Sequence, residues 1–273
     1  MNSNLSQIFR IQKYLERIKY PDAYRIAREI SEFLDTNYDF SEKDILNRLK
    51  NGQPWEYICG YTRFCENIFK VTKDTLIPRI ESEQIVYDTI EIIKNSNIKN
   101  VIDVGTGTGC LIISIAKILD NNFYSFWATD ISQETLKVAE YNEKNIINKQ
   151  IIHWIKTDLI SDIPQLNKLT FIIANLPYIT TKQYLQLDKS VKEYEPRIAL
   201  DGGKDGLKHY KKLFKQIKEK NLPVKYIYIE TEESIFNSTK ELIKSCFPTS
   251  IINEKQDYFN KKRFLLTTLP ELK

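Results

Sequence analysis

The chain has 273 residues, of which 42% are hydrophobic and 28% charged, and its 40 Lys and Arg against 36 Asp and Glu give a formal net charge of +4. This is the composition of an ordinary globular protein with one large or two modest domains, and it excludes an intrinsically disordered chain. The four cysteines are scattered and there are only two histidines, which excludes a zinc-binding set of ligands and His-dependent hydrolysis. No apolar run reaches the ~18 residues of a membrane span. We therefore expect a reduced, cytoplasmic protein without a metal.

Residues 5–50 predict a small bundle of amphipathic helices. Apolar residues recur at every third or fourth position, which is the spacing of one helix face. They are Leu5, Ile8, Ile11, Leu15 and Ile18, then Ala23, Ile26, Ala27, Ile30 and Leu34. Ser41 is the predicted N-cap of a third helix. We therefore expect a helical domain over residues 1–55.

A hairpin is expected to follow this bundle. Apolar and polar residues alternate at 56–60 and again at 68–71, as in two half-buried strands. We assign residues 56–84 to this hairpin and to a linker between two domains.

Strands alternate with helices in the rest of the chain, over residues 85–273. The expected strands are the short buried runs at 101–104, 126–130, 151–158, 171–174 and 225–230, and the expected helices lie at 110–119, 134–145 and 205–220. This order predicts an α/β fold with a mostly parallel, doubly wound, Rossmann-like sheet that is covered by helices on both faces. A ligand in such a sheet binds beyond the carboxyl ends of the strands.

Three alternate glycines follow the first of these strands, in the run Gly105, Thr106, Gly107, Thr108 and Gly109. They allow the backbone to approach a ligand closely, and the next helix offers free N–H groups. A dinucleotide fingerprint would have a glycine at the position of Cys110. The strand-borne Asp103 instead favours binding of S-adenosylmethionine, and a turn without a ligand is the alternative.

Acidic residues close the next two strands. Asp130 stands where a carboxylate hydrogen-bonds ribose hydroxyls in this architecture, and it is equally suited to capping the helix ahead of Ser132. Asp158 and Leu159 end the third strand, where Asp158 would accept from an adenine amino group and Leu159 would pack on the ring. A plain turn is the alternative for this pair.

The run Asn175, Leu176, Pro177 and Tyr178 follows the fourth strand directly. Pro177 restricts Leu176 to an extended conformation and so fixes its carbonyl, and the side-chain oxygen of Asn175 is a second acceptor. Two acceptors beside the Tyr178 ring suit a planar –NH2 group, whose lone pair they orient towards a methyl donor. No general base is needed, because the methylated nitrogen is strongly acidic. We predict that Asn175, Pro177 and Tyr178 are catalytic and that all four residues contact the substrate; a simple turn is the alternative.

Three further segments resemble those of the bacterial release factor glutamine methyltransferases, the HemK/PrmC family. They are Q-P-W-E-Y-I-C-G at 53–60, L-I-P-R-I-E-S-E at 76–83 and E-P-R-I-A-L-D-G-G-K-D-G-L at 195–207. The resemblance covers most of the chain and implies a class I methyltransferase fold with a small N-terminal helical domain and a linking β-hairpin. It also implies methyl transfer from S-adenosylmethionine to the side-chain nitrogen (N5) of the glutamine in the Gly-Gly-Gln motif of class-1 peptide chain release factors.

Carried over by position, the resemblance implies two sets of site residues. Residues 105–109, Asp130, the turn at 158–159 and Asn175 would hold S-adenosylmethionine, and residues 175–178 would hold the substrate amide. Arg79 and Glu81 would border the same cleft as substrate contacts, and Glu83 would lie beside them. The alternative for all three residues is that they hold the two domains together.

Two positions depart from the family's pattern, because Leu176 and Ile80 stand where it has proline. The N-L-P-Y form is also familiar from ribosomal RNA adenine dimethyltransferases. An RNA or DNA adenine N6-methyltransferase is therefore the second hypothesis, with the basic stretch 209–215 as a nucleic-acid face or, as we favour, a solvated helix face. A non-catalytic binding protein and a nicotinamide dehydrogenase are further alternatives. We expect a monomer that acts on a protein, not on nucleic acid or at a membrane, and that docks it on the N-terminal bundle.

Overall fold

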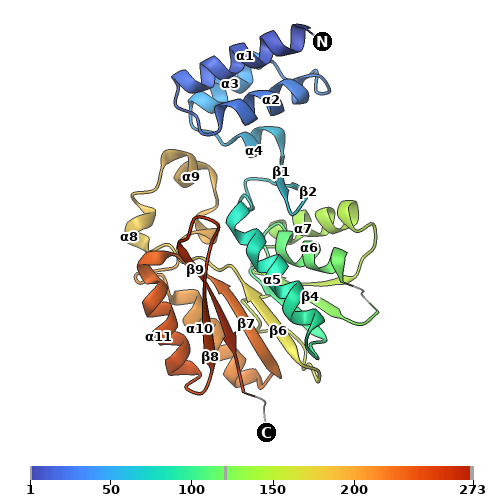
Figure 1. Cartoon of the computed structure of the whole chain (residues 1–273), viewed down its shortest axis with the longest axis vertical. Helices are drawn as coiled ribbons and strands as arrows, with labels where there is room; N and C mark the ends of the chain where they lie inside the picture. The colour runs from blue at the N-terminus through green and yellow to red at the C-terminus, as the bar shows by residue number, and fades with distance from the viewer. Residues whose placement is uncertain (1, 120–121, 271–273) are drawn as a thin grey trace. The chain divides into compact units, whose positions relative to one another are not determined.

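The computed structural model describes residues 2–119 and 122–270 (Figure 1). Residue 1, in the predicted helical domain, and residues 120–121 and 271–273, in the predicted methyltransferase domain, lie outside the described residues. Within the described ranges, no helix combines the length and the apolar character needed to cross a membrane.

The chain divides into two compact units. The first comprises the residues up to Tyr61 together with Asp188–Tyr194, and the second comprises Thr62–Leu187 and the residues from Glu195 onward. The chain therefore passes between the units three times, because the first unit includes seven residues from within the C-terminal half.

The first unit is helical. It contains α1 (Asn2–Arg17), α2 (Ala23–Leu34), α3 (Glu42–Lys50), α4 (Trp55–Cys59) and α9 (Lys189–Tyr194). The predicted helices of residues 5–50 are confirmed, and Ser41 caps α3 by accepting from the N–H of Asp44 at 3.1 Å. The apolar stripes meet in one core, in which Ile11, Ile30 and Trp55 are almost fully buried.

The prediction of a strand at 56–60 is wrong. Residues 56–59 belong to α4 (Trp55–Cys59), and Gly60 is the residue that follows the end of this helix. Five residues of alternating polarity also fit one helical turn, and this turn buries Trp55 and Ile58, which are three positions apart. The hairpin comes later, with β1 (Tyr61–Phe64) and β2 (Asn67–Lys70).

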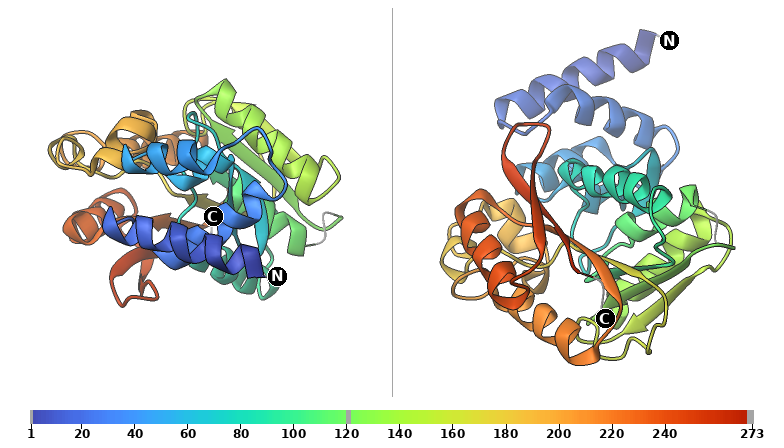
Figure 2. Two further views of the ribbon diagram at one scale, coloured as in Figure 1. Left: turned by 90° about the horizontal axis from the view of Figure 1, so that it is seen from above. Right: turned by 60° about the horizontal axis from the view of Figure 1, so that its bottom comes forward.

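The second unit is built on a sheet of seven strands. They are β3 (Asn100–Val104), β4 (Ser125–Asp130), β5 (Ile152–Lys156), β6 (Thr170–Ala174), β7 (Val224–Glu230), β8 (Ile251–Gln256) and β9 (Lys262–Thr268). The order across the sheet is β5-β4-β3-β6-β7-β9-β8, and only β9 runs antiparallel to its neighbours. The five predicted strands are confirmed. The C-terminal hairpin of β8 and β9 (red in Figure 2) lies where the sequence pattern predicts no strand.

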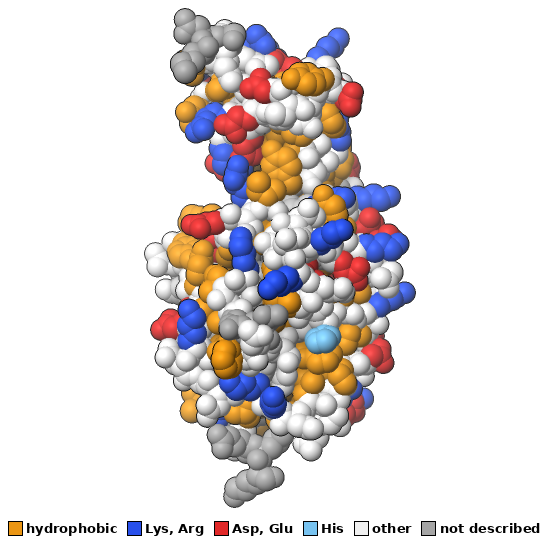
Figure 3. Space-filling model, turned by 90° about the vertical axis from the view of Figure 1, so that its right-hand side faces the viewer, with side chains coloured by type: hydrophobic (Ala, Val, Ile, Leu, Met, Phe, Trp, Pro, Cys, Tyr) orange, Lys and Arg blue, Asp and Glu red, His pale blue; other side chains and the backbone are white. Residues whose placement is uncertain are grey.

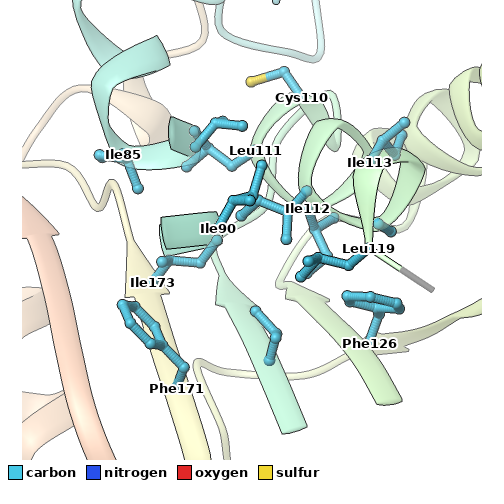
Figure 4. Close-up of a cluster of buried hydrophobic side chains, with 14 of the residues drawn as sticks. Ile85, Ile90, Cys110, Leu111, Ile112, Ile113, Leu119, Phe126, Phe171 and Ile173 are labelled. Carbon is cyan, nitrogen blue, oxygen red and sulfur yellow. The ribbon is translucent and has the colours of Figure 1, made fainter. Parts of the chain in front are cut away.

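Helices cover both faces of this sheet, as predicted for a doubly wound fold. On one face lie α5 (Glu83–Lys94), α6 (Cys110–Ile118) and α7 (Gln133–Ile146), and on the other lie α10 (Lys208–Lys220) and α11 (Phe236–Cys246). Successive residues of β6 enter the two cores in turn, because Phe171 faces the first and Ile172 the second. Figure 4 shows Ile90 of α5 and Ile112 of α6 in the first core, with Phe171 on the strand below them. The connections to the strands include the short helices η1 (Ile80–Ser82), α8 (Thr181–Tyr184), η2 (Arg197–Ala199) and η3 (Glu233–Ile235).

Candidate active site

A cavity of about 350 Å³ opens at the carboxyl edge of the sheet. Its walls come from the loops after β3, β4, β5 and β6, from residues 74–82 ahead of α5, from Ile198 and Ala199 of η2, and from the first turns of α10. The strand order reverses between β3 and β6, and doubly wound sheets bind ligands at such a reversal. The volume falls in the range of small-molecule sites, about 300–1,000 Å³.

The glycine loop forms one wall of the cavity and is held by the neighbouring strand. The N–H groups of Gly105 and Thr106 both donate to the carbonyl of Thr129 at 2.9 Å. Residues 105–108 line the cavity, whereas Gly109 lies behind them as the residue before α6. These hydrogen bonds tie the start of the loop to the end of β4.

Asp130 connects this loop to the next strand. Its Oδ2 accepts from the N–H of Gly107 at 3.1 Å, and its Oδ1 accepts from the N–H of Ser132 at 2.9 Å. Burial raises the pKa of Asp130, and these N–H donors oppose the rise. Ser132 is itself the cap of α7, accepting from the N–H of Thr135. Asp130 thus supports the helix start and also lines the cavity.

The space beside Gly107 fits the predicted cofactor. Gly107 has φ +57°, and a Cβ added to it would meet no atom within 4 Å. A ligand can therefore lie directly against the backbone at this point. The carboxylate of Asp130 borders the same cavity, and Ile131 and Leu159 add apolar walls. Polar groups for a ribose and apolar walls for an adenine ring are both present.

The turn after β5 contributes a charged pair to the rim. The half-exposed carboxylate of Asp158 forms an ion pair with the ammonium group of Lys212 on α10. Leu159 is buried with φ +58°, and both residues of the turn line the cavity. An adenine amino group that donated to Asp158 would have to share this carboxylate with Lys212.

Asn175 follows β6 directly, and two acceptors orient its side-chain amide. Its Nδ2 donates to Ser82 Oγ at 3.2 Å and to Glu230 Oε2 at 3.0 Å. Oδ1 is then the remaining polar atom of this side chain, and Asn175 lines the cavity together with Leu176 and Pro177. The structure brings these three residues and the glycine loop together around one space.

Tyr178 is half-buried and does not line the cavity. Its hydroxyl donates to Glu230 Oε1 at 3.2 Å, and its ring packs against the core on the α10 side of the sheet. Burial and the nearby carboxylate raise the pKa of Tyr178 well above its ordinary value, so the hydroxyl keeps its proton. The structure anchors this ring through its hydroxyl group.

Arg79 and Glu81 lie in the segment that precedes α5. Arg79 lines the cavity, and its guanidinium is 2.5 Å from Oε1 of the buried Glu195. Glu81 is half-buried and does not line the cavity, and Glu83 accepts from the N–H of Cys65 at 2.6 Å. Of the three, only Arg79 reaches the candidate site.

The segment 195–207 supports the Asn-Leu-Pro-Tyr run through its backbone. The N–H of Gly202 donates to the carbonyl of Ile179 at 2.7 Å, and the N–H of Ile179 donates to the carbonyl of Leu200 at 3.1 Å. A Cβ on Gly202 would lie only 2.6 Å from the carbonyl oxygen of Pro177. Any side chain at this position would therefore displace the run.

Sequence reasoning missed several residues of this site. Ser82 and Glu230 contact Asn175 across 93 and 55 positions of the chain, and no local pattern connects residues so far apart. An acidic residue that closes the buried run at 224–229 was the available signal, because it stands at the ligand-binding edge. Lys208, His209 and Lys212 of α10 also line the cavity. Within residues 2–119 and 122–270, no group of acidic, His or Cys side chains is placed to hold a metal ion.

Asp103 is buried in β3 beneath the loop. It is 1% exposed, and its Oδ2 accepts from Thr106 Oγ1 at 2.7 Å. Burial, opposed mainly by this hydrogen bond, raises the pKa of Asp103 to about 7. The carboxyl therefore carries a proton in the folded protein at a pH where it is ionised in the unfolded chain.

Replacement of Asp103 by asparagine is expected to flatten the pH dependence of stability. In the unfolded chain this carboxyl has a pKa of about 4. In the pH window between that value and about 7, the native state therefore binds one proton more than the unfolded state. The stabilisation from this group is complete below that window and is lost as the pH rises to about 7. From pH 5 to pH 8 the free energy of unfolding of the wild type should fall by about 3 kcal/mol relative to Asp103→Asn, measured by urea denaturation. Parallel pH profiles for the two proteins would contradict this account.

Comparison with known proteins gives a consistent result. Residues 85–193 match the family model described as Ribosomal protein L11 methyltransferase (PrmA). The release factor glutamine methyltransferase of Mycoplasma mycoides subsp. mycoides is 38% identical over 205 residues, which cover 74% of this chain and 71% of that protein. That of Flavobacterium psychrophilum is 33% identical over 227 residues, covering 81% and 77%. The catalytic domain of human METTL16 with an RNA hairpin from the MAT2A 3′UTR has the same fold, with a TM-score of 0.56, 17% identity and 74% of each chain covered.

Proposed function

Because the chain belongs to the release factor glutamine methyltransferase family, we propose that it methylates N5 of the glutamine in the Gly-Gly-Gln motif of class-1 peptide chain release factors. S-adenosylmethionine is the cofactor and supplies the methyl group when bound. The observation that carries the proposal is the orientation of Asn175, which turns both its N–H bonds toward Ser82 and Glu230 beside the glycine loop.

Asn175 and Leu176 would hold the substrate amide. The amide –NH2 donates to Asn175 Oδ1 and to the carbonyl of Leu176, so the amide nitrogen is held with its lone pair facing the cavity. Fixed acceptors also stabilise the positive charge that develops on this nitrogen. The proton lost from the methylated nitrogen needs no dedicated base. Pro177 keeps the Leu176 carbonyl in place. The ring of Tyr178 does not line the cavity, so we propose that it supports the run through its hydroxyl group, which Glu230 anchors.

The other side of the cavity would hold the cofactor. Asp130 would accept from the ribose hydroxyls, and the apolar side chains of Ile131 and Leu159 would pack against the adenine ring. Residues 105–109 would pass beneath the remainder of the cofactor, with Gly107 at the closest approach.

The fold alone does not separate an amide from a base as substrate, so nucleic acid is the alternative outcome of the test. On the face drawn in Figure 3, Lys and Arg side chains are interspersed with Asp, Glu and apolar side chains and form no continuous basic track. On α10 the apolar residues Tyr210, Leu213 and Phe214 are buried, as in an amphipathic helix packed on the sheet. On this face, therefore, no basic surface favours a nucleic acid over a protein.

The proposal is tested by incubating the protein with methyl-labelled S-adenosylmethionine, a release factor and ribosomal RNA together. We expect the label on the release factor, in the peptide that contains Gly-Gly-Gln, and its loss when that glutamine is replaced by alanine. Label on the RNA and none on the protein would establish the adenine methyltransferase instead.

We further propose that residues 1–55 form a docking domain, joined by the segment 56–84 to a catalytic domain over 85–273. A single glutamine on a large protein requires recognition beyond the pocket. The helical unit carries exposed apolar side chains for this purpose, among them Leu5 and Phe9, which lie one turn apart on α1 and are 69% and 61% exposed.

Deletion of residues 1–50 is expected to raise the KM for the release factor by at least about tenfold, while the Kd of S-adenosylmethionine stays within about twofold. The reason is that every residue that lines the cavity belongs to the second unit. Steady-state kinetics and calorimetric titration of the cofactor measure the two quantities. An unchanged KM would refute the docking role, and a lost cofactor affinity would show that the truncated chain is misfolded.

We propose that the protein works as a monomer. We propose that this monomer acts in the cytoplasm, where a release factor would meet it.

A further inference from the structure

Glu230 is a buried carboxylate that joins the predicted active-site residues. It ends β7 and is 1% exposed. Its Oε2 accepts from Ser82 Oγ at 2.5 Å and from Asn175 Nδ2 at 3.0 Å, and its Oε1 accepts from the hydroxyl of Tyr178 at 3.2 Å. One side chain thus binds both ends of the Asn-Leu-Pro-Tyr run.

The surroundings of Glu230 determine where donors and acceptors can lie. Arg263 Nη1 is 3.8 Å from Oε1, and Nε of the same guanidinium donates to Asp257 at 2.8 Å. Burial raises the pKa of Glu230, whereas the hydrogen bond from Ser82 and the charge of Arg263 lower it. The positive charge lies on the Oε1 side, and the two hydrogen bonds to Oε2 lie on the other.

This arrangement fixes which way the Asn175 amide points. An asparagine side chain can exchange its oxygen and nitrogen by half a turn, and the partners decide between the two orientations. A carboxylate only accepts, so the –NH2 group must face Glu230. Ser82 gives its own proton to Glu230 and therefore also accepts from Asn175. Both N–H bonds of Asn175 are used, and Oδ1 is left as an acceptor.

We propose that Glu230 is a positioning residue that holds Asn175 as an acceptor for the substrate amide and anchors Tyr178 at the same time. The inference rests on the proposed function, because the group to be oriented is the –NH2 of a glutamine. If the Asn175 amide were reversed, its –NH2 would face the –NH2 of the substrate, and two donors would repel each other. The reaction therefore depends on the direction of one amide, which Glu230 sets without touching the substrate.

The variant Glu230→Gln tests this directly. Arg263 draws the new amide oxygen to the Oε1 position, so the new –NH2 lies at the Oε2 position and faces Asn175. Asn175 then turns its oxygen inward and presents its –NH2 to the substrate. We expect kcat to fall by about 100-fold, as for the loss of an oriented hydrogen bond in a transition state. The Kd of S-adenosylmethionine should stay within about twofold, because the loop and Asp130 are unchanged.

Adding Asn175→Asp to Glu230→Gln should restore part of the rate that Glu230→Gln removes. In Asn175→Asp alone, two carboxylates face each other and the rate falls. In the double variant Asn175→Asp, Glu230→Gln, the new –NH2 group donates to one oxygen of the new carboxylate, and the other oxygen accepts from the substrate, while the total charge equals that of the wild type. We expect the double variant to be at least about tenfold faster than either single variant, which is a coupling that a purely structural role does not produce.

Glu143→Gln is the matched control. Glu143 is a buried glutamate of the same unit that accepts from the N–H groups of Ile151 and Ile152 and from Trp154 Nε1, and it does not line the cavity. This variant should lower the melting temperature and leave kcat within about twofold. A Glu230→Gln variant with the wild-type rate overturns the inference. If that variant does not fold, the comparison of Asn175→Asp with the double variant decides, and equal rates overturn it. Absence of methyl transfer by the wild type is a different result, because it refutes the proposed function itself.

Discussion

Replacement of Asn175 by alanine is expected to lower the single-turnover rate of methyl transfer by about 10²–10³-fold. The substitution removes the acceptor that orients the substrate amide and leaves Ser82 and Glu230 without a donor that they bind at 3.2 and 3.0 Å. The Kd of S-adenosylmethionine should change by less than about fivefold, since the glycine loop and Asp130 remain in place. Rapid-quench kinetics with labelled cofactor and equilibrium titration measure the two effects.

Asn100→Ala is the appropriate control for this variant. Asn100 is also a buried asparagine whose side chain donates to two acceptors, the carbonyl of Lys168 and the hydroxyl of Thr170. It is the first residue of β3 and so lies at the amino-terminal ends of the strands, away from the cavity. Its replacement should destabilise the protein by about 1–3 kcal/mol and leave the rate unchanged. If Asn175→Ala transferred methyl groups as fast as Asn100→Ala, the run after β6 would not be catalytic, and a binding protein without activity would become the better hypothesis.

Gly107→Ala is expected to weaken S-adenosylmethionine binding by at least about tenfold, or more than about 1.4 kcal/mol, and to lower the free energy of unfolding by only about 1 kcal/mol. The added Cβ meets no protein atom within 4 Å, so it takes up space in the cavity and disturbs no packing. The positive φ of +57° adds a conformational cost of about 1 kcal/mol. The rise in melting temperature caused by S-adenosylmethionine should therefore shrink in this variant.

Gly109→Ala separates cofactor binding from folding. Its φ is +79°, and a Cβ there would lie 2.7 Å from Ile113 Cδ1 and 3.2 Å from Ala139 Cβ. Because this contact is with the core, we expect a loss of about 2–4 kcal/mol in the free energy of unfolding. Equal destabilisation by the two substitutions would contradict the assignment of Gly107 to the ligand side. A melting temperature raised by NADH, and not by S-adenosylmethionine, would revive the dehydrogenase hypothesis.

The elements that sequence reasoning predicted are those with a strong local signal. The buried runs of β3, β4, β6 and β7 and the loop between β3 and α6 lie where the pattern placed them. A run of apolar residues followed by glycines predicts a buried strand and a loop without knowledge of the rest of the chain, because burial and backbone freedom are properties of consecutive residues. The same holds for the cap of α3 at Ser41.

Local patterns fail where a segment is short or where the partner is distant. The five residues of α4 fit both the period of a strand and that of a helix. They form a helix because this conformation buries Trp55 in the core of the helical unit. In the sequence, nothing distinguishes Glu230 from another acidic residue at the end of a strand. The pairing of β7 with β6 sets Ala174 beside Ile229 and so brings the following residues, Asn175 and Glu230, into contact. The ion pair of Arg79 and Glu195 likewise joins segments 116 positions apart.

The close approach of Gly202 to Pro177 changes how the segment 195–207 should be interpreted. This stretch identifies the family, yet its glycine contacts the peptide backbone of Pro177 and Tyr178. Such a contact transmits rigidity and carries no information about which molecule is methylated. In this chain the segment therefore meets a mechanical requirement of the run after β6. Changes of target should be sought at exposed positions of the cavity wall such as Ile198, because Leu176 is 3% exposed and packs in the core.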